Sequence, residues 1–251
     1  MLSLLVVLGA FASAVASDVA ILTNDNFTSY VDGSKNVFVK FYAPWCGHCK
    51  RMAPAWEEVA ATFKDEDDVV IAKVDSTVER ELSDKYEVRG YPTLKFFPKG
   101  KTESEPYDGG READPMVEFV NQKAGTFRKK GGDLKEEAGK ITALEPLIKE
   151  YAQCAKGKKE CFDGAMKKVD DEIAKQKPSM EKVAKFYKKM LDKMGTDPKE
   201  GLKEWKKELE RLTKIGAGSM AADKKTWVTQ RKNVLTYMVS IADTEGDKDE
   251  L

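Results

Sequence analysis

Residues 41–50 read FYAPWCGHCK and contain two cysteines, Cys46 and Cys49, separated by two residues. The only histidine of the chain, His48, lies between them. Such a pair can bind a metal, form a structural crosslink or exchange thiols with disulfides. A zinc site needs four ligands, which only His48 and two distant cysteines could complete, and a crosslink across so short a loop constrains little of the chain. The pattern therefore favours a redox-active pair and no metal.

The segments on either side of the pair predict where it lies. Residues 36–42 are mostly apolar, β-branched or aromatic, which predicts a buried strand, and a helix is expected over residues 47–63. Cys46 then lies at a helix N-terminus, where free N–H groups and the helix dipole favour a thiolate, so we expect a low pKa and a nucleophile. Cys49 lies one turn later and is expected to attack a mixed disulfide formed at Cys46. His48 is expected to help stabilise the thiolate.

Strand and helix patterns alternate over residues 18–125. The expected strands are 19–22, 36–42, 69–74 and 93–97, with a last one near 106–107, and the expected helices are 24–31, 47–63, 77–86 and 114–122. This alternation, which ends in a hairpin, predicts a central mixed sheet with helices on both faces.

Beyond residue 125 the strand patterns stop. A Lys-Lys-Gly-Gly joint at 129–132 precedes apolar residues that recur at helical spacing, so we expect a small helical bundle. Thr142, with a capping-box pattern, Ser179, and Asp197 before a proline are expected helix starts. A final helix is expected around Trp227.

The charges divide between the two parts of the chain. The formal net charge is zero, but the first part is net acidic and the second net basic, which indicates two units with different surfaces. The lysines of the second part alternate with acids, and no aromatic residues are interleaved to stack on bases. We therefore expect no nucleic-acid partner.

Both ends carry targeting patterns. Residues 1–16, MLSLLVVLGAFASAVA, are apolar and end in small residues, but they are too few to span a bilayer. They predict a signal peptide removed after Ala16. Residues 243–251 form a polar tail that ends in Lys-Asp-Glu-Leu, a retrieval signal read by the KDEL receptor. We therefore expect a protein of the endoplasmic reticulum lumen with no membrane insertion.

Four stretches of the first part resemble the catalytic thioredoxin-like domain of protein disulfide isomerases. They are FYAPWCGHCK, AKVD at 72–75, VRGYPTLKFF at 88–97 and YDGGRE at 107–112. The helical part resembles the D domain that a minority of these enzymes carry. The resemblance implies an α/β thioredoxin-like fold over residues 17–125, followed by a small all-α domain over residues 126–242.

The resemblance also implies a function. Such a protein would form, reduce and rearrange disulfides in unfolded or misfolded secretory proteins, with glutathione or an upstream oxidase as redox partner. No cofactor is expected, because the dithiol is itself the redox group. A non-catalytic folding escort that binds clients through the helical part is the alternative, and the sequence does not separate an isomerase from a peroxide-coupled oxidase.

The resemblance assigns roles to single residues. Cys46 is the nucleophile and Cys49 the resolving thiol. Arg111 matches an arginine thought to swing towards the resolving cysteine and lower its pKa, and the bond before Pro92 is expected to be cis. The remaining assignments are Gly47, His48, Lys40 and Lys73 as pKa-modulating residues and Trp45, Tyr91 and Pro92 as substrate-binding residues.

One position departs from the family pattern. The family commonly has a buried glutamate at the position of Lys40, where it pairs with the lysine of AKVD, here Lys73, and accepts the proton of the resolving cysteine. Two ammonium groups cannot comfortably share a dry site, so we expect at least one of them to reach solvent or lose its proton. A neutral lysine could serve as the base instead.

Two further cysteines, Cys154 and Cys161, lie in YAQCAKGKKECF. On one unbroken helix they would be about 10.5 Å apart along the axis, beyond the roughly 7 Å Cα limit of a disulfide. Gly157 between them is a poor residue for a helix interior. If the chain turns there, a structural disulfide can form across two helix ends; two free thiols are the alternative.

Asn26, in the sequence Asn-Phe-Thr, is a possible N-glycosylation site. It also lies near the start of an expected helix, where capping competes with glycosylation.

Overall fold

The structure, a computed structural model, describes residues 17–176 and 180–246. The chain forms two compact units, Met1–Ala124 and Gly125–Leu251. The expected signal peptide, the helix start at Ser179 and the terminal Lys-Asp-Glu-Leu lie outside the described residues.

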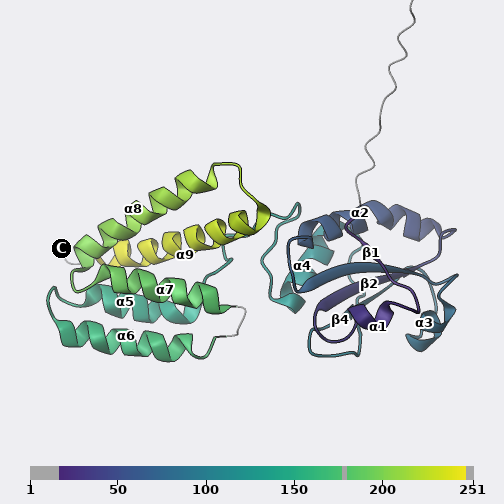
Figure 1. Cartoon of the computed structure of the whole chain (residues 1–251), viewed down its shortest axis with the longest axis horizontal. Helices are drawn as coiled ribbons and strands as arrows, with labels where there is room; N and C mark the ends of the chain where they lie inside the picture. The colour runs from purple at the N-terminus through teal and green to yellow at the C-terminus, as the bar shows by residue number, and fades with distance from the viewer. Residues whose placement is uncertain (1–16, 177–179, 247–251) are drawn as a thin grey trace, which may run out of the picture. The chain divides into compact units, whose positions relative to one another are not determined.

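The first unit is built on a mixed sheet, as the alternating pattern predicts (Figure 1). Its strand order in the described part of the chain is β1-β3-β2-β4-β5, with β1, β3 and β2 parallel and β4 and β5 antiparallel to their neighbours. The strands are β1 (Ala20–Ile21), β2 (Asn36–Tyr42), β3 (Val69–Asp75), β4 (Thr93–Phe97) and β5 (Glu105–Pro106). The helices are α1 (Phe27–Tyr30), α2 (Gly47–Phe63), α3 (Arg80–Lys85) and α4 (Ala113–Ala124).

Two apolar clusters cover the two faces of this sheet. Phe38 packs with residues of α2 and α4, including Trp56 and Met116, on one face. Val37, Val39 and Phe41 pack with α1 and α3 on the other. Because successive side chains of a strand point to opposite faces, Lys40 shares the α2 face with Phe38.

The two short helices, α1 and α3, are shorter than predicted. Before α1, the Asn26 side chain accepts a hydrogen bond from the Thr23 amide at 2.8 Å. Before α3, the Asp75 carboxylate accepts hydrogen bonds from the amide and the hydroxyl of Thr77. These local side-chain bonds hold turns where the apolar pattern alone predicted helix.

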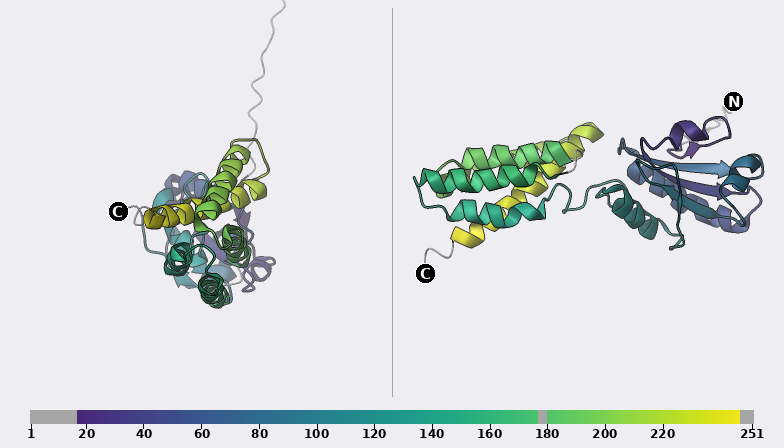
Figure 2. Two further views of the ribbon diagram at one scale, coloured as in Figure 1. Left: turned by 90° about the vertical axis from the view of Figure 1, so that its left-hand side faces the viewer. Right: turned by 90° about the horizontal axis from the view of Figure 1, so that it is seen from below.

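The second unit is a helical bundle (Figure 2). Its core is a single cluster that includes Trp205, Tyr187, Leu191 and Met238, each at most 1% exposed. The helices are the 3₁₀ turn η1 (Thr142–Leu144), α5 (Glu145–Gln153), α6 (Lys159–Ile173), α7 (Glu181–Met194), α8 (Pro198–Gly216) and α9 (Ala222–Gly246).

Two predicted helix starts can be compared with the structure. Asp197 caps α8, accepting a hydrogen bond from the Glu200 amide at 3.3 Å, as predicted. Thr142 instead begins a 3₁₀ turn without a side-chain cap, and α5 follows from Glu145. Pro146 in the first turn of α5 is well placed there, because that turn leaves amides without helical partners.

The turn between α5 and α6 contains a disulfide. Cys154 and Cys161 are bonded, with their Cα atoms 5.8 Å apart. Gly157 lies between them at φ +77°, a left-handed conformation that suits glycine, and its amide donates to the Thr196 carbonyl. The chain therefore turns at Gly157, and the two cysteines meet across the ends of two helices.

Candidate active site

The end of β2 and the start of α2 position the cysteine pair. Cys46 is the N-cap residue of α2, in an extended conformation, and its sulfur accepts a hydrogen bond from the Cys49 amide at 3.3 Å. Both cysteines are free thiols and buried, in a small cluster with Ala43 against Tyr42 and Tyr91. The expected location at a helix N-terminus is therefore the observed one.

The two thiols differ in acidity. Hydrogen bonds from Cys49 and from the His48 backbone amide, together with the charge of Arg51, lower the pKa of Cys46, although partial desolvation opposes them. Burial, followed by the hydrogen bond with Cys46, raises the pKa of Cys49 to about 11. Cys46 is thus the thiol that ionises first and attacks first. Cys49 stays protonated until something removes its proton.

Arg51 is a residue beside the thiols that the sequence analysis missed. Its guanidinium is 2.8 Å from the His48 Nδ1 atom on the exposed turn of α2. The His48 ring therefore lies with Arg51, while the His48 backbone amide acts on Cys46. Gly47 contributes none of the interactions that lower the pKa of Cys46, so its assigned role stays a prediction. The three-residue spacing of His48 and Arg51 on a helix could have revealed this pair.

An aromatic surface adjoins the thiols. Trp45 is 71% exposed, and its ring centroid lies 6.0 Å from that of Tyr91 in an edge-to-face arrangement. The Tyr91–Pro92 bond is cis, and the Tyr91 carbonyl accepts a weak hydrogen bond from the Cys46 thiol at 3.6 Å. The exposed indole therefore borders the thiol site, and the substrate-binding role assigned to Trp45, Tyr91 and Pro92 stays a prediction.

Lys40 lies behind the pair, in the core of the first unit. It is 5% exposed, and its Nζ atom lies 5.3 Å from the Trp56 ring and 5.9 Å from the Tyr42 ring. Burial, followed by repulsion from Lys73, lowers the pKa of Lys40 to about 8, while the charges of Cys49 and Glu57 oppose this change. Lys40 and Cys49 are thus close enough for the charge of each to act on the other.

Lys73 reaches the surface instead. β2 and β3 pair Lys40 directly with Lys73, but the Lys73 ammonium lies 3.8 Å from the Glu57 carboxylate of α2. Glu57 also accepts a hydrogen bond from the Ser17 hydroxyl. Lys40 therefore remains buried, while Lys73 forms an ion pair with Glu57. This is the outcome expected when two like charges cannot share one dry site. Glu57 was not identified from the sequence, because an acid on a half-buried helix face is common.

Two assigned residues lie apart from the thiols. Arg111 is exposed and acts on Tyr107, whose pKa burial raises and Arg111 lowers; its role towards Cys49 stays a prediction. Asn26 donates its amide N–H to the Ile21 carbonyl at 3.0 Å, so the atom that a glycan would occupy is used within the fold. These contacts do not test glycosylation, but they show that both polar atoms of the side chain are used within the fold.

The described residues hold no cluster of metal-ligating side chains. Within the same residues, none of the helices has the length and apolar character needed to cross a bilayer.

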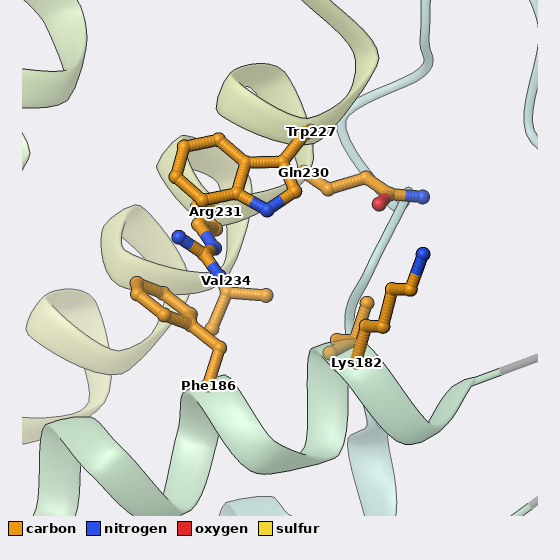
Figure 3. A pocket seen from close by; sticks show the side chains of 7 residues that line it. Lys182, Phe186, Trp227, Gln230, Arg231 and Val234 are labelled. Carbon is orange, nitrogen blue, oxygen red and sulfur yellow. The ribbon is translucent and has the colours of Figure 1, made fainter. Parts of the chain in front are cut away.

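A groove between α7 and α9 marks the surface of the second unit (Figure 3). The groove is shallow and encloses a volume of only about 20 Å³. The Arg231 guanidinium stacks 3.4 Å from the Trp227 ring centroid and 4.8 Å from that of Phe186, and Trp227 is 41% exposed. Figure 3 shows Lys182 and Gln230 on the polar side of the groove.

Comparisons with known proteins match both units. Residues 18–122 match the Thioredoxin family, and residues 139–238 match the family "Endoplasmic reticulum protein ERp29, C-terminal domain". The first thioredoxin domain of mouse protein disulfide-isomerase A4 is 39% identical, with a TM-score of 0.38, over 43% of this chain and 74% of that one. The fold and the N-cap thiol define a dithiol protein with a thioredoxin domain and an ERp29-type helical domain.

Curated relatives match most of the chain. A probable protein disulfide-isomerase A6 of Medicago sativa is 43% identical over 88% of this chain, and the protein disulfide isomerase-like 2-1 of Oryza sativa subsp. japonica is 42% identical over 91%. Over about nine tenths of its length the chain is therefore similar to proteins named protein disulfide isomerases. It spans 59% and 61% of the length of these two relatives.

Proposed function

We propose that the chain is a thiol–disulfide oxidoreductase and isomerase that acts through Cys46 and Cys49. The observation that carries this proposal is the sulfur of Cys46 at the N-cap of α2, where it accepts the Cys49 amide. That arrangement favours the thiolate, which is the attacking species in disulfide exchange. The names of the relatives support the same activity.

The exchange runs in two steps. The Cys46 thiolate attacks one sulfur of a client disulfide, forming a mixed disulfide and releasing the other client sulfur as a thiolate. Cys49 then attacks Cys46, and the client leaves reduced while the pair becomes a disulfide. Run in reverse, the same steps transfer the pair's disulfide to a client dithiol. If a client thiol attacks the mixed disulfide before Cys49 does, the client is isomerised with no net change in oxidation.

Turnover of a scrambled, disulfide-bonded test protein by the purified chain tests this proposal. Cys46→Ala should abolish turnover, and Cys49→Ala should accumulate mixed disulfides. The double variant Cys154→Ala, Cys161→Ala is the control, because it removes the other two cysteines, which lie far from α2 in the sequence, and it should keep its activity. Full turnover by Cys46→Ala would contradict the proposal.

The proposed location is the lumen of the endoplasmic reticulum, with unfolded or misfolded secretory proteins as clients. The match of the second unit to the ERp29 domain and the names of the relatives support this location. So do the targeting patterns at the two ends of the sequence. Glutathione or an upstream oxidase would reoxidise the pair, and the KDEL receptor would retrieve the protein. Cell fractionation with and without the last four residues tests the location.

A second candidate function is client holding by the helical unit, favoured by the exposed aromatic groove at Trp227. Trp227→Ala should weaken suppression of client aggregation while leaving thiol exchange unchanged. Ile215→Ala is the control, because Ile215 is a similarly exposed apolar residue of α8. Equal effects of the two substitutions on client aggregation would contradict client binding in the groove.

A further inference from the structure

We propose that Lys40 is the proton acceptor of the resolving thiol Cys49 and that it works as a neutral amine. The inference rests on the proposed thiol exchange and concerns its second step. It assigns a chemical role to a buried lysine whose Nζ atom lies among aromatic rings.

The need for such a group comes from Cys49 itself. Its thiol is buried, and its pKa of about 11 leaves a thiolate fraction of only about 10⁻⁴ near neutral pH. Attack on the mixed disulfide requires the thiolate. A nearby base that takes the proton during the attack removes this limit.

Lys40 is positioned to be that base. It lies on the α2 face of β2, the face covered by the helix that carries Cys49. Aromatic rings rather than carboxylates line its surroundings, with Trp56 at 5.3 Å and Tyr42 at 5.9 Å from the Nζ atom. Such rings tolerate the ammonium once it forms but do not hold the proton as a carboxylate would.

The charged groups around Lys40 act in opposite directions. Lys73 on β3 repels the ammonium, and Cys49 and Glu57 on α2 attract it. On the third side, β4 presents the apolar Leu94 opposite Lys40. Lys73 forms an ion pair with Glu57 at 3.8 Å, and its repulsion disfavours an ammonium on Lys40. The pKa of Lys40, about 8, gives a useful population of neutral amine at physiological pH.

The proposed step is balanced in protons and electrons. The Lys40 amine takes the Cys49 proton, and the thiolate attacks the Cys46 sulfur of the mixed disulfide. The Cys46–client bond breaks, the Cys46–Cys49 bond forms, and the client sulfur leaves as a thiolate that solvent protonates. In this step the neutral Lys40 amine becomes an ammonium as the Cys49 thiol becomes a thiolate. The new positive charge therefore forms beside the new negative charge. Lys40 then returns its proton to solvent.

The test separates the two steps in the full-length protein. The reduced chain is mixed with excess 5,5′-dithiobis(2-nitrobenzoate), so that Cys46 attack and Cys49 resolution each release one coloured thiolate, followed by stopped-flow absorbance. Lys40→Met should slow the second release about a hundredfold near pH 7.5 and leave the first within about twofold. Lys40→Gln should behave in the same way.

The pH profile distinguishes proton acceptance from a packing effect. In the native chain the second release should rise with pH and level off above about pH 8, where Lys40 is neutral. In Lys40→Met it should keep rising towards about pH 11, where Cys49 ionises unaided. Lys95→Met, a substitution on β4 opposite Val39, is the control and should retain the native profile.

Each outcome has one meaning. Slowing of the second release alone, with the changed pH profile, supports the role of Lys40. An unchanged second release, equal slowing of both releases, or the same effect in Lys95→Met overturns it. Absence of the first release from the native chain would instead contradict the proposed function, and this inference with it.

Discussion

Burial of Lys40 should lower the free energy of unfolding of the first unit, and Lys40→Met should raise it again. The pKa of Lys40 falls from 10.5 to about 8 on folding, and each pKa unit corresponds to about 1.4 kcal/mol. Holding the ammonium inside the fold therefore costs about 3 kcal/mol near pH 7. Methionine has a similar length and no charge, so it removes this cost. The loss of the contacts with the Trp56 and Tyr42 rings reduces the resulting gain in stability by about 1 kcal/mol.

The pH dependence follows from the direction of the change. An unfolded lysine keeps its proton up to about pH 10.5, whereas folded Lys40 releases it near pH 8, so the cost is full below pH 8 and fades between these values. At about pH 10 only about 1 kcal/mol remains. Lys40→Met should thus stabilise the first unit by about 2 kcal/mol near pH 7 and by almost nothing near pH 10.

Fluorine NMR of fluorotryptophan-labelled, reduced protein during urea titration measures this effect. Trp56 reports unfolding of the first unit, and Trp205, buried in the second, serves as an internal reference. Lys95→Met is the matched control and should show no pH-dependent gain. A gain that is equal at both pH values, or a loss of stability near pH 7, would refute the reasoning, because either result means that Lys40 is not buried as a strained cation.

Further predictions concern the cysteines and Asn26. Because the pKa of Cys46 is lowered and that of Cys49 is about 11, iodoacetamide near pH 7 should label Cys46 first in the reduced protein; mass mapping that finds equal labelling would contradict the assignment. Removing the disulfide by Cys154→Ala, Cys161→Ala should destabilise the second unit by about 2.5 kcal/mol, measured by urea titration; no loss would mean that the turn is held by its hydrogen bonds alone. Glycosidase treatment of the protein from secretory cells should produce no mobility shift at Asn26, whose amide donates to Ile21.

The sheet was predictable from the sequence because its strands are continuous apolar runs. The segment 36–42 predicted β2 with the bounds that the structure has, and the turn at Gly157 led to the expectation that Cys154 and Cys161 could meet. The short helices were overestimated, since the side chains of Asn26 and Asp75 hold turns that an apolar pattern does not reveal.

The position of the two thiols at the start of α2 was predictable from the sequence, but their surroundings were only partly so. Lys40 and Lys73 were expected to compete for one dry site. That Glu57 forms the ion pair with Lys73 depends on how α2 packs on the sheet, which no local pattern encodes. Arg51 was missed for a similar reason, because its effect on Cys46 depends on the orientation of an exposed side chain.

The cap of α2 links catalysis to helix stability. In the proposed exchange the sulfur that would react with clients is also the atom that accepts the Cys49 amide in the first turn of the helix. When Cys46 is bound to a client, that sulfur is neutral and a poorer acceptor, so the helix loses part of a contribution that caps make, about 1 kcal/mol. The cap is restored when Cys46 becomes a free thiol again, either because a client thiol displaces it or because the Cys46–Cys49 disulfide is reduced. Each catalytic cycle therefore loosens and tightens the start of α2, and the tightened state favours the free enzyme over the covalent complex.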